Sequence, residues 1–189
     1  MRKVRRDELL DLDAYARSRD EIRGPVIAAK RRRLVTVGGV LDFLFENTAT
    51  IRYQIQEMIR AERLQKEADV VHELETYNEL LGGPGELGVS LLIGLPDAAE
   101  RDRKLRDWLD LPRHLYVKLA GGEKVRARFD PRQVGEDRLS SVQYLKFDVK
   151  GEAPVAVGSD LPALTVETTL TDEQRTALGE DLRSDLARA

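Results

Sequence analysis

Three side chains able to bind a metal ion recur at helical spacing in the middle of the chain. His72, Glu75 and Glu79 occupy positions i, i+3 and i+7, so a helix would project all three from one side. A histidine and two carboxylates on one face form a ligand set that suits zinc, iron or manganese. That face lies almost opposite the apolar stripe of Val70 and Leu74, which indicates that it points to water. We therefore assign no metal ligand and predict no cofactor. In the alternative, the protein binds a metal or acts as an enzyme through these three residues.

A further carboxylate, Glu62, continues the apolar stripe that begins with Ile51 and Ile55. A carboxylate on a buried helix face must be paired, protonated or functional, because an unpaired buried charge is very costly. Glu62 is therefore a candidate buried carboxylate. It offers a second site at which this chain could act as an enzyme or bind a metal. The alternative is that burial stops at Ile59 and that Glu62 pairs with Lys66.

Four polar residues of the same predicted helix form a cationic ridge. Arg52, Gln56, Arg60 and Arg63 fall within roughly 80° of arc at 100° per residue. Guanidinium groups bind carboxylates and phosphates through paired hydrogen bonds, so the ridge suits an anionic ligand or an acidic partner. The alternative is a polar helix face whose arginines pair with neighbouring glutamates. We take the four residues as the predicted partner- or anion-binding site.

Basic and aromatic residues also alternate with apolar ones on the outward sides of predicted strands. They are Lys118, Arg126, Arg128 and Lys146, with Tyr116 and Tyr144 among them. Such a surface can bind single-stranded nucleic acid through charge and stacking. The formal net charge of −3 argues against it, because nucleic-acid binding normally needs a basic excess. We expect no nucleic-acid partner and keep this face as the weaker alternative.

Composition limits the remaining chemistry. The chain has 189 residues, 41% apolar and 34% charged, which is typical of a soluble globular protein. It has no cysteine, which excludes disulfides, thiolate metal sites and cysteine nucleophiles. It contains no phosphate loop, dinucleotide fingerprint or nucleophile elbow. It also lacks the apolar run of about 18 residues that a membrane helix needs, so we expect a cytoplasmic protein with no membrane partner.

Charge is unevenly distributed between the two ends of the chain. Residues 1–33 hold eleven basic and six acidic side chains, a balance of +5, and residues 151–189 hold three basic and eight acidic ones, a balance of −5. We interpret this as two ends that lie near each other or are solvated. The alternative is a basic N-terminal arm that docks on an acidic partner.

The elements that position these residues predict an α+β fold. The segment 48–81 contains no glycine or proline, and we favour one long central helix over a break at residues 63–66. Gly24-Pro25 is expected to interrupt a helical stretch before it. Strands are predicted at 34–37, 40–45, 87–95, 114–119, 125–129, 142–150 and 164–168. Short turns between them indicate an antiparallel sheet, formed largely by the C-terminal half and covered by a helical N-terminal half. We predict a single domain over 1–189, with a helical part at 1–83 and a sheet-rich part at 84–189.

Several runs resemble a known family. They are Phe45-Glu46-Asn47, residues 54–58 with Arg60 and Glu62, Glu75, residues 77–80, and residues 142–147. Together they resemble a bacterial family of uncharacterised proteins whose genes often lie beside those for rubrerythrin and an iron–sulfur oxidoreductase. The resemblance covers nearly the whole chain. It implies a link to redox or oxidative-stress metabolism and a rubrerythrin-like or iron–sulfur redox partner, and it assigns no functional residue.

The function expected first is a non-enzymatic accessory protein that binds a redox partner or assembles into a homo-oligomer. The cationic ridge and the uneven charge favour docking. The sequence does not decide whether the chain has an enzymatic activity, so the site at Glu62 or at His72, Glu75 and Glu79 remains the alternative.

Overall fold

Two antiparallel sheets form the centre of the protein, whose computed structural model describes residues 1–186, with side chains described as far as Ser184. Sheet A has the strand order β1 (Leu34–Val37), β2 (Leu41–Glu46), β3 (Glu86–Ile93) and β6 (Val142–Asp148). Sheet B has the order β5 (Lys124–Arg126), β4 (Leu115–Lys118), β7 (Ala156–Leu161) and β8 (Leu164–Thr169). The predicted α+β class is confirmed, with two sheets where one was expected. The last three residues of the predicted domain, 187–189, lie outside the described residues.

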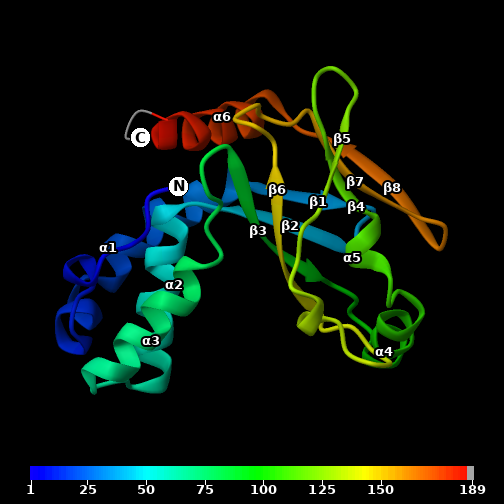
Figure 1. The fold of residues 1–189 in the computed structure, drawn as a ribbon. Helices are drawn as coiled ribbons and strands as arrows, with labels where there is room; N and C mark the ends of the chain where they lie inside the picture. The colour runs from blue at the N-terminus through cyan, green and yellow to red at the C-terminus, as the bar shows by residue number, and fades with distance from the viewer. Residues whose placement is uncertain (187–189) are drawn as a thin grey trace.

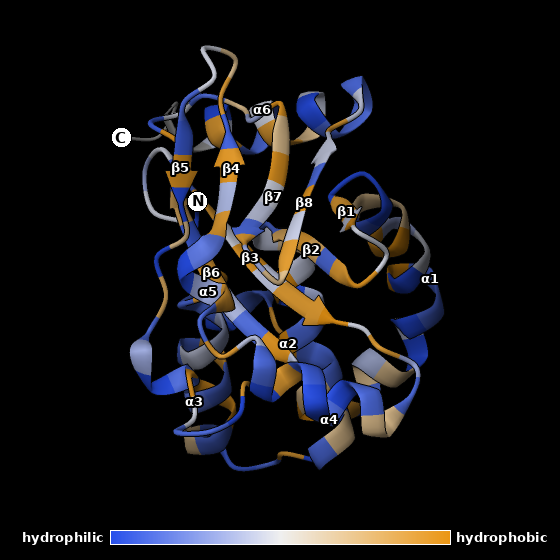
Figure 2. Ribbon diagram, turned by 90° about the vertical axis from the view of Figure 1, so that its right-hand side faces the viewer, coloured by the Kyte–Doolittle hydropathy of each residue, from blue (hydrophilic) through white to orange (hydrophobic). Residues whose placement is uncertain are grey.

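The two sheets enclose one apolar core and meet along both edges (Figure 1). On one side a backbone bridge joins Arg128, just after β5, to Lys146 of β6. On the other side β8 lies beside β1, where the Thr168 hydroxyl donates to the carbonyl of Thr36 at 3.2 Å. The inward residues of the central strands, such as Phe43, are fully buried, whereas those of β5 and β8 are half-buried. Figure 2 shows the end of β3 coloured as hydrophobic and α4 largely as hydrophilic.

Helices cover the ends of this core and build a second one. They are α1 (Leu12–Arg31), α2 (Thr48–Glu62), α3 (Glu67–Asn78), α4 (Ala98–Asp107), α5 (Leu111–His114) and α6 (Asp172–Leu186), with 3₁₀ turns at Arg6–Glu8 and Pro131–Gln133. Trp108 and Leu178 pack into the sheet core. Ile55 of α2 and Leu74 of α3 belong to a separate apolar cluster that they share with Val4 and Leu9 of the N-terminal segment. None of the described helices is long and apolar enough to cross a membrane.

The prediction of one long helix over 48–81 is wrong. Helix α2 ends at Glu62, and Arg63 adopts the left-handed conformation (φ 53°), after which α3 begins at Glu67. The two halves carry apolar stripes that point in different directions, so a straight helix could bury only one of them against the same neighbours. The break turns α3 back onto α2, and Val70 packs in the same cluster as Ile59. The helix before β1 also differs from the prediction, because α1 continues through Pro25, which is exposed.

The oppositely charged ends of the chain lie near each other, as one of the two interpretations predicts. Arg33, just after α1, is 6% exposed and forms two hydrogen bonds of 2.7 and 2.9 Å with the carboxylate of Asp181 in α6. Arg32 lies 3.5 Å from both Glu173 and Glu180. The basic residues at this point therefore attach α6 to the rest of the fold, and they are not free for a partner.

Candidate functional site

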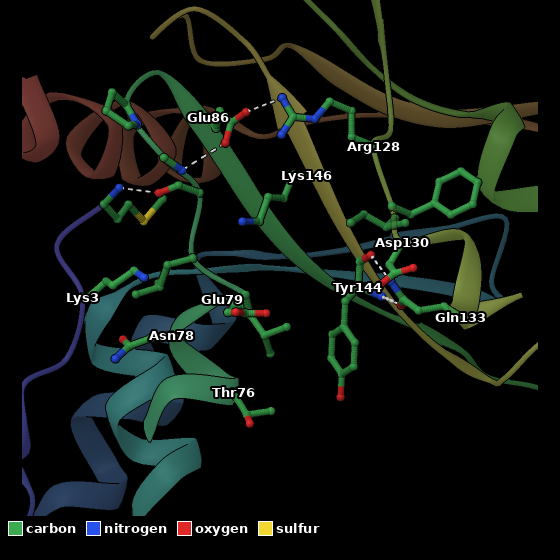
Figure 3. Close-up of a pocket in the computed structure, with 18 residues that line it drawn as sticks. Lys3, Thr76, Asn78, Glu79, Glu86, Arg128, Asp130, Gln133, Tyr144 and Lys146 are labelled. Carbon is green, nitrogen blue, oxygen red and sulfur yellow. Dashed lines mark hydrogen bonds and ion pairs between the residues drawn. The ribbon is translucent and has the colours of Figure 1, made fainter. Parts of the chain in front are cut away.

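A cleft of about 820 Å³ lies between the helical layer and the outer face of sheet A. One wall comes from the N-terminal segment, the end of α3 and the loop that follows it. The other wall comes from β6 and the segment 128–133 (Figure 3). A cleft of this size matches the sites that bind small organic molecules.

The N-terminal wall is held in place by two buried amide side chains. Asn78, 6% exposed at the end of α3, accepts from the backbone N–H of Val4 at 2.8 Å and donates to its carbonyl at 2.9 Å. Gln56 of α2, 4% exposed, does the same for Leu10, at 2.6 and 3.2 Å. Each amide satisfies both backbone groups of one residue, as a neighbouring strand would. The N-terminal segment, including Lys3, is thereby fixed against α2 and α3.

The opposite wall is fixed by the segment that follows β5. Gln133 accepts from the backbone N–H of Tyr144 at 2.7 Å and donates to its carbonyl at 3.1 Å. The backbone groups of Arg128 and Lys146 exchange two hydrogen bonds of 2.8 Å. These contacts occupy the outer edge of β6, so that edge is not open for pairing with another strand. The face of β6 that carries Tyr144 and Lys146 stays turned toward the cleft.

The charges of the cleft are only partly neutralised. Glu86 forms an ion pair with Arg128 at 2.8 Å and accepts from the backbone N–H of Gly83 at 3.1 Å. The side chains of Lys3 and Lys146 form no hydrogen bond or ion pair with any described residue, and Glu79 interacts with Arg132 through charge alone. Figure 3 shows Lys3 and Lys146 on opposite walls, with Glu79 between and below them. Two ammonium groups and one carboxylate leave an uncompensated positive charge that attracts an anion.

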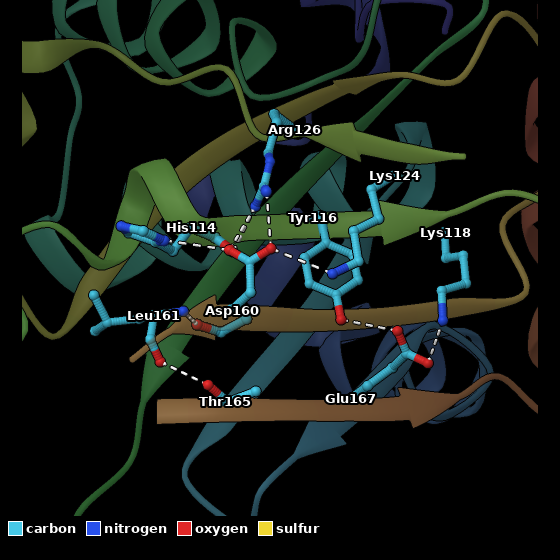
Figure 4. A network of polar contacts seen from close by, with 10 residues as sticks. His114, Tyr116, Lys118, Lys124, Arg126, Asp160, Leu161, Thr165 and Glu167 are labelled. Carbon is cyan, nitrogen blue, oxygen red and sulfur yellow. Dashed lines mark hydrogen bonds and ion pairs between the residues drawn. The ribbon is translucent and has the colours of Figure 1, made fainter. Parts of the chain in front are cut away.

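The outer face of sheet B shows the opposite arrangement, which Figure 4 displays. Asp160 accepts two hydrogen bonds of 2.8 Å from Arg126, lies 3.3 Å from Lys124 and 3.2 Å from Nδ1 of His114. The guanidinium of Arg126, together with His114 and Lys124, holds the pKa of the Asp160 carboxyl well below its usual value. The cations of this face are therefore already engaged.

A second part of the same network surrounds Tyr116. Its ring is 3% exposed, and the Nζ of Lys124 lies 4.0 Å from the ring centroid. Its hydroxyl donates to Glu167 at 2.8 Å, and Lys118 donates to the same carboxylate at 2.6 Å. Burial, and then the hydrogen bond to Glu167, raise the pKa of Tyr116 to about 12. A covered ring of this kind offers no surface on which a base could stack.

The predicted nucleic-acid face is therefore divided between two places. Lys118, Arg126 and Tyr116 lie in the neutralised network of sheet B, whereas Lys146 and Tyr144 line the cleft of sheet A. The prediction treated the strands as one sheet, and the pairing of β6 with β3 separates them. The structure does not bring the six predicted residues onto one surface.

The predicted cationic ridge is only partly formed. Gln56 is buried and holds Leu10, so it belongs to the packing of the N-terminal segment. Arg60 lies 3.3 Å from Glu57, whose pKa Arg19 lowers to about 2 through paired hydrogen bonds. Arg52 and Arg63 are exposed, and in the described part of the chain their side chains form no hydrogen bond or ion pair. They remain available to an anion or a partner.

Both carboxylate predictions concern side chains that are exposed. Glu62 is not a buried carboxylate, and burial on α2 stops at Ile59, as the alternative predicted. The ion pair with Lys66 does not form among the described residues. His72, Glu75 and Glu79 are all exposed, and within the described residues no group of three His, Asp or Glu side chains is placed to hold a metal ion. Of these residues, only Glu79 takes part in the cleft.

Sequence reasoning missed the residues that define the cleft. Lys3 was grouped with the basic residues at the start of the chain, and Lys146 with the outward face of a single sheet. The available signal was the run Leu91-Leu92-Ile93 in the predicted strand 87–95, because it places apolar residues on both faces of that strand. In the structure Leu92 is 46% exposed, so the outer face of β3 is uncovered at this end.

Comparison with known proteins places the chain in a family. The family model described as "Protein of unknown function (DUF3501)" matches residues 3–182. The chain belongs to the DUF3501 family. Its fold is similar to the crystal structure of a novel protein of unknown function from Burkholderia pseudomallei K96243, with a TM-score of 0.88 and 28% identity over 96% of this chain and 100% of that chain. No curated protein matches the chain.

The resemblance noted in the sequence predicts that the chain belongs to a family of uncharacterised proteins, and the match to the family model confirms this. In this DUF3501 chain two of the runs that carried the resemblance meet at the cleft. Asn78 and Glu79, from the run 77–80, lie on one wall, and Tyr144 and Lys146, from the run 142–147, lie on the other. The sequence runs gave no reason to expect that they would face each other.

Proposed function

We propose that this DUF3501 protein is a non-enzymatic binding protein and that the cleft between α3 and β6 holds its ligand. The observation that carries the proposal is the pair of lysines, Lys3 and Lys146, on opposite walls of an open cleft, neither of which has a partner among residues 1–186. Unpaired charges in a concave site favour the binding of a complementary group.

The polar groups of the cleft support binding over catalysis. A nucleophile or general base is normally activated by a second group within hydrogen-bond reach. The Tyr144 hydroxyl and the Glu79 carboxylate have no such partner among the described residues. His114 is held by Asp160 on the outer face of sheet B, and His72 is exposed on α3.

The proposal is tested by filling the cleft. Thr76 is exposed on α3 and lines the cleft, so Thr76→Trp would occupy it with a large side chain. Thr176 is exposed on α6, away from the cleft lining, so Thr176→Trp is the matched control. Each protein is incubated with a bacterial small-molecule extract and washed, and the retained compounds are released by denaturation and identified by mass spectrometry.

We expect the native chain and Thr176→Trp to retain the same compounds, and Thr76→Trp to retain at most a tenth as much. The retained compound should keep its mass after hours of incubation with the protein, because no reaction is proposed. Equal retention by Thr76→Trp would contradict the cleft as the site. Conversion of the compound would contradict the non-enzymatic role.

A second candidate function is docking to an acidic redox partner through α2. The exposed arginines support it, since Arg52 and Arg63 have no partner within the described chain and Arg60 is 44% exposed at its side chain. The resemblance stated above supplies the nature of the partner, a rubrerythrin-like or iron–sulfur redox protein. If the same face of α2 binds a second copy of the chain instead, the protein is a homo-oligomer.

The docking proposal is tested by charge reversal. Changing Arg52, Arg60 and Arg63 to Glu should reduce the capture of a purified rubrerythrin-like protein at least tenfold, because three attractions become repulsions. The same change at Arg103 of α4 and Arg183 of α6, both exposed, should leave capture unchanged. Equal capture by both variants would refute docking through α2.

A further inference from the structure

The outward face of β6 changes from charged to apolar along its length. Asp148, Lys146, Tyr144 and Val142 alternate with inward residues, so all four project from the same face of the strand. Leu92 lies directly opposite Val142 on β3 and projects from that face as well. Tyr144, Val142 and Leu92 are 39%, 37% and 46% exposed, so they form an apolar strip that leads away from the lysine end of the cleft.

The charges at the basic end fit one anionic head group. Lys146 and Lys3 face the cleft from opposite walls, and Glu86 already neutralises Arg128. Asp130 is likewise paired with Arg132. Glu79 subtracts one charge and Asp148 lies outside the cleft lining, so the unpaired lysine and glutamate side chains that line the cleft carry a net charge of +1. A carboxylate or phosphate head is complementary to this end, and a cationic head is not.

The length of the strip sets the size of the apolar part. From Lys146 to Val142 the strand advances by four residues, or about 13 Å at 3.3 Å per residue. An extended alkyl chain of about ten carbons covers the same distance. The exposed apolar surface amounts to roughly a few hundred Å², well below the ~800 Å² per partner that a stable protein interface buries. A small amphipathic molecule therefore fits the strip better than a second protein does.

We infer that the cleft and the adjoining strip bind an amphipathic organic anion. Its carboxylate or phosphate head lies between Lys3 and Lys146, and its apolar chain lies along Tyr144, Val142 and Leu92. This inference rests on the proposed function of the cleft and names the class of its ligand.

The inference is tested by calorimetric titration with hexanoate, octanoate, decanoate and dodecanoate below their micellar concentrations. A fully buried methylene contributes about 0.8 kcal/mol, and a half-covered one on an open strip contributes less. We therefore expect the affinity to rise about threefold for each two carbons and to level off near ten. Decanol and decyltrimethylammonium should bind at least tenfold more weakly than decanoate, because they lack the anionic head.

Three variants separate the two ends of the site. Lys146→Gln should weaken every carboxylate by about fivefold or more and keep the dependence on chain length. Leu92→Ser should flatten the dependence on chain length and leave hexanoate unaffected. Leu34→Ser is the matched control, since Leu34 is 40% exposed on the same sheet but lies on the far edge strand β1. It should bind the whole series as the native chain does.

The source of the ligand is resolved with vesicles of phosphatidylglycerol and phosphatidylcholine. Binding of decanoate without retention on vesicles assigns the site to a free amphiphile. If the vesicles retain the native chain, and both Lys146→Gln and Leu92→Ser abolish that retention, the anionic head and the apolar chain belong to a membrane lipid.

Three results would overturn the inference. They are an affinity independent of chain length, decanol binding as tightly as decanoate, and a dimer of the native chain that Leu92→Ser dissociates. The proposed function fails separately, through the Thr76→Trp variant. The native chain could capture a compound that lacks an anionic head or an apolar chain. If Thr76→Trp then fails to retain that compound, the cleft is a binding site and only the ligand class is wrong.

Discussion

The cleft beside β6 and the outer face of sheet B contain the same kinds of residue and differ in how their charges are arranged. On sheet B, Asp160 and Glu167 engage Arg126, Lys124 and Lys118, each across one intervening strand. In the cleft, the lysines stand on separate walls and have no carboxylate partner among the described residues. The difference teaches that a count of basic and aromatic residues does not identify a binding surface, because neighbours across a sheet can neutralise them.

The two regions also differ in what holds them together. The N-terminal wall of the cleft is held at Val4 and Leu10 by neutral amide groups, those of Asn78 and Gln56, and only at Arg6 by an exposed ion pair with Glu67 among the contacts of this segment with α2 and α3. The network of sheet B depends on ion pairs, which salt screens. The following predictions test this difference, beginning with the largest effect.

Replacement of Asn78 by Leu should release the N-terminal wall. The buried N–H and carbonyl of Val4 would lose their partner, and an unsatisfied buried polar group costs about 1–3 kcal/mol. We expect the free energy of unfolding to fall by about 2–4 kcal/mol in urea titrations, equally at low salt and in 1 M NaCl. Amide hydrogen exchange in residues 1–11 should accelerate, and Thr76→Ala, at an exposed site on α3, should change neither quantity. A loss smaller than about 0.5 kcal/mol would show that the amide does not hold this wall.

Replacement of Asp160 by Asn should lower the free energy of unfolding by about 1–2 kcal/mol, because Arg126, Lys124 and His114 would lose their shared anion. The effect should shrink by half or more in 1 M NaCl. Asp20→Asn, at an exposed site in α1, is the control and should have no effect. Because the folded pKa of Asp160 is depressed, its contribution is present above the unfolded pKa and is lost as the pH falls below about 4. Equal losses at low and high salt would contradict the charge-based account.

Alkaline titration tests the buried tyrosine of the same network. The folded pKa of Tyr116 is raised to about 12, so the folded protein keeps a proton that the unfolded chain loses near pH 10. Stability should therefore decrease as the pH rises above about 10, and Tyr116→Phe should remove part of that decrease. Glu167→Gln should move the tyrosine transition, followed by ultraviolet absorbance, toward lower pH without restoring the ordinary value, since burial remains the larger cause. An unchanged transition would exclude the hydrogen bond as a contributor.

The smallest effect is expected from a matched pair of lysine replacements. Lys146→Met removes no ion pair, so the free energy of unfolding should change by less than about 0.5 kcal/mol. Lys118→Met removes the bond to Glu167 and should lower it by about 0.5–1 kcal/mol. The comparison is made by thermal unfolding of both variants in one buffer. If Lys146→Met were the more destabilising variant, Lys146 would have a structural role and the cleft would lose one of its two free cations.

Local chemistry made much of the fold predictable. Gly38 and Gly39 adopt positive φ angles in the turn between β1 and β2, where only glycine does so without strain. Asn47 caps α2 by accepting from the backbone N–H groups of Ala49 and Thr50, the usual role of an asparagine at a helix start. The strands predicted at 114–119 and 125–129 pair as the hairpin of β4 and β5 around Gly121-Gly122. Each of these features depends on residues close in the chain, and the α+β class follows from them.

The site itself was beyond the reach of the sequence. Two contacts that build the site, the pairing of β6 with β3 and the docking of Val4 onto Asn78, join residues that are far apart in the chain. The break at Arg63 separates two apolar helix stripes that point in different directions. Whether a lysine is paired depends on which strands lie near it in the sheet. The hydrophobic periodicity of the sequence does not determine the order of the strands. Local patterns in the sequence predicted most helices and strands, apart from the break at Arg63 and the strand β7, and they identified the charged residues. The three-dimensional fold sets which charges meet: the lysines of sheet B are neutralised and, within the described residues, those of the cleft are not, because charges cancel through space and not along the chain.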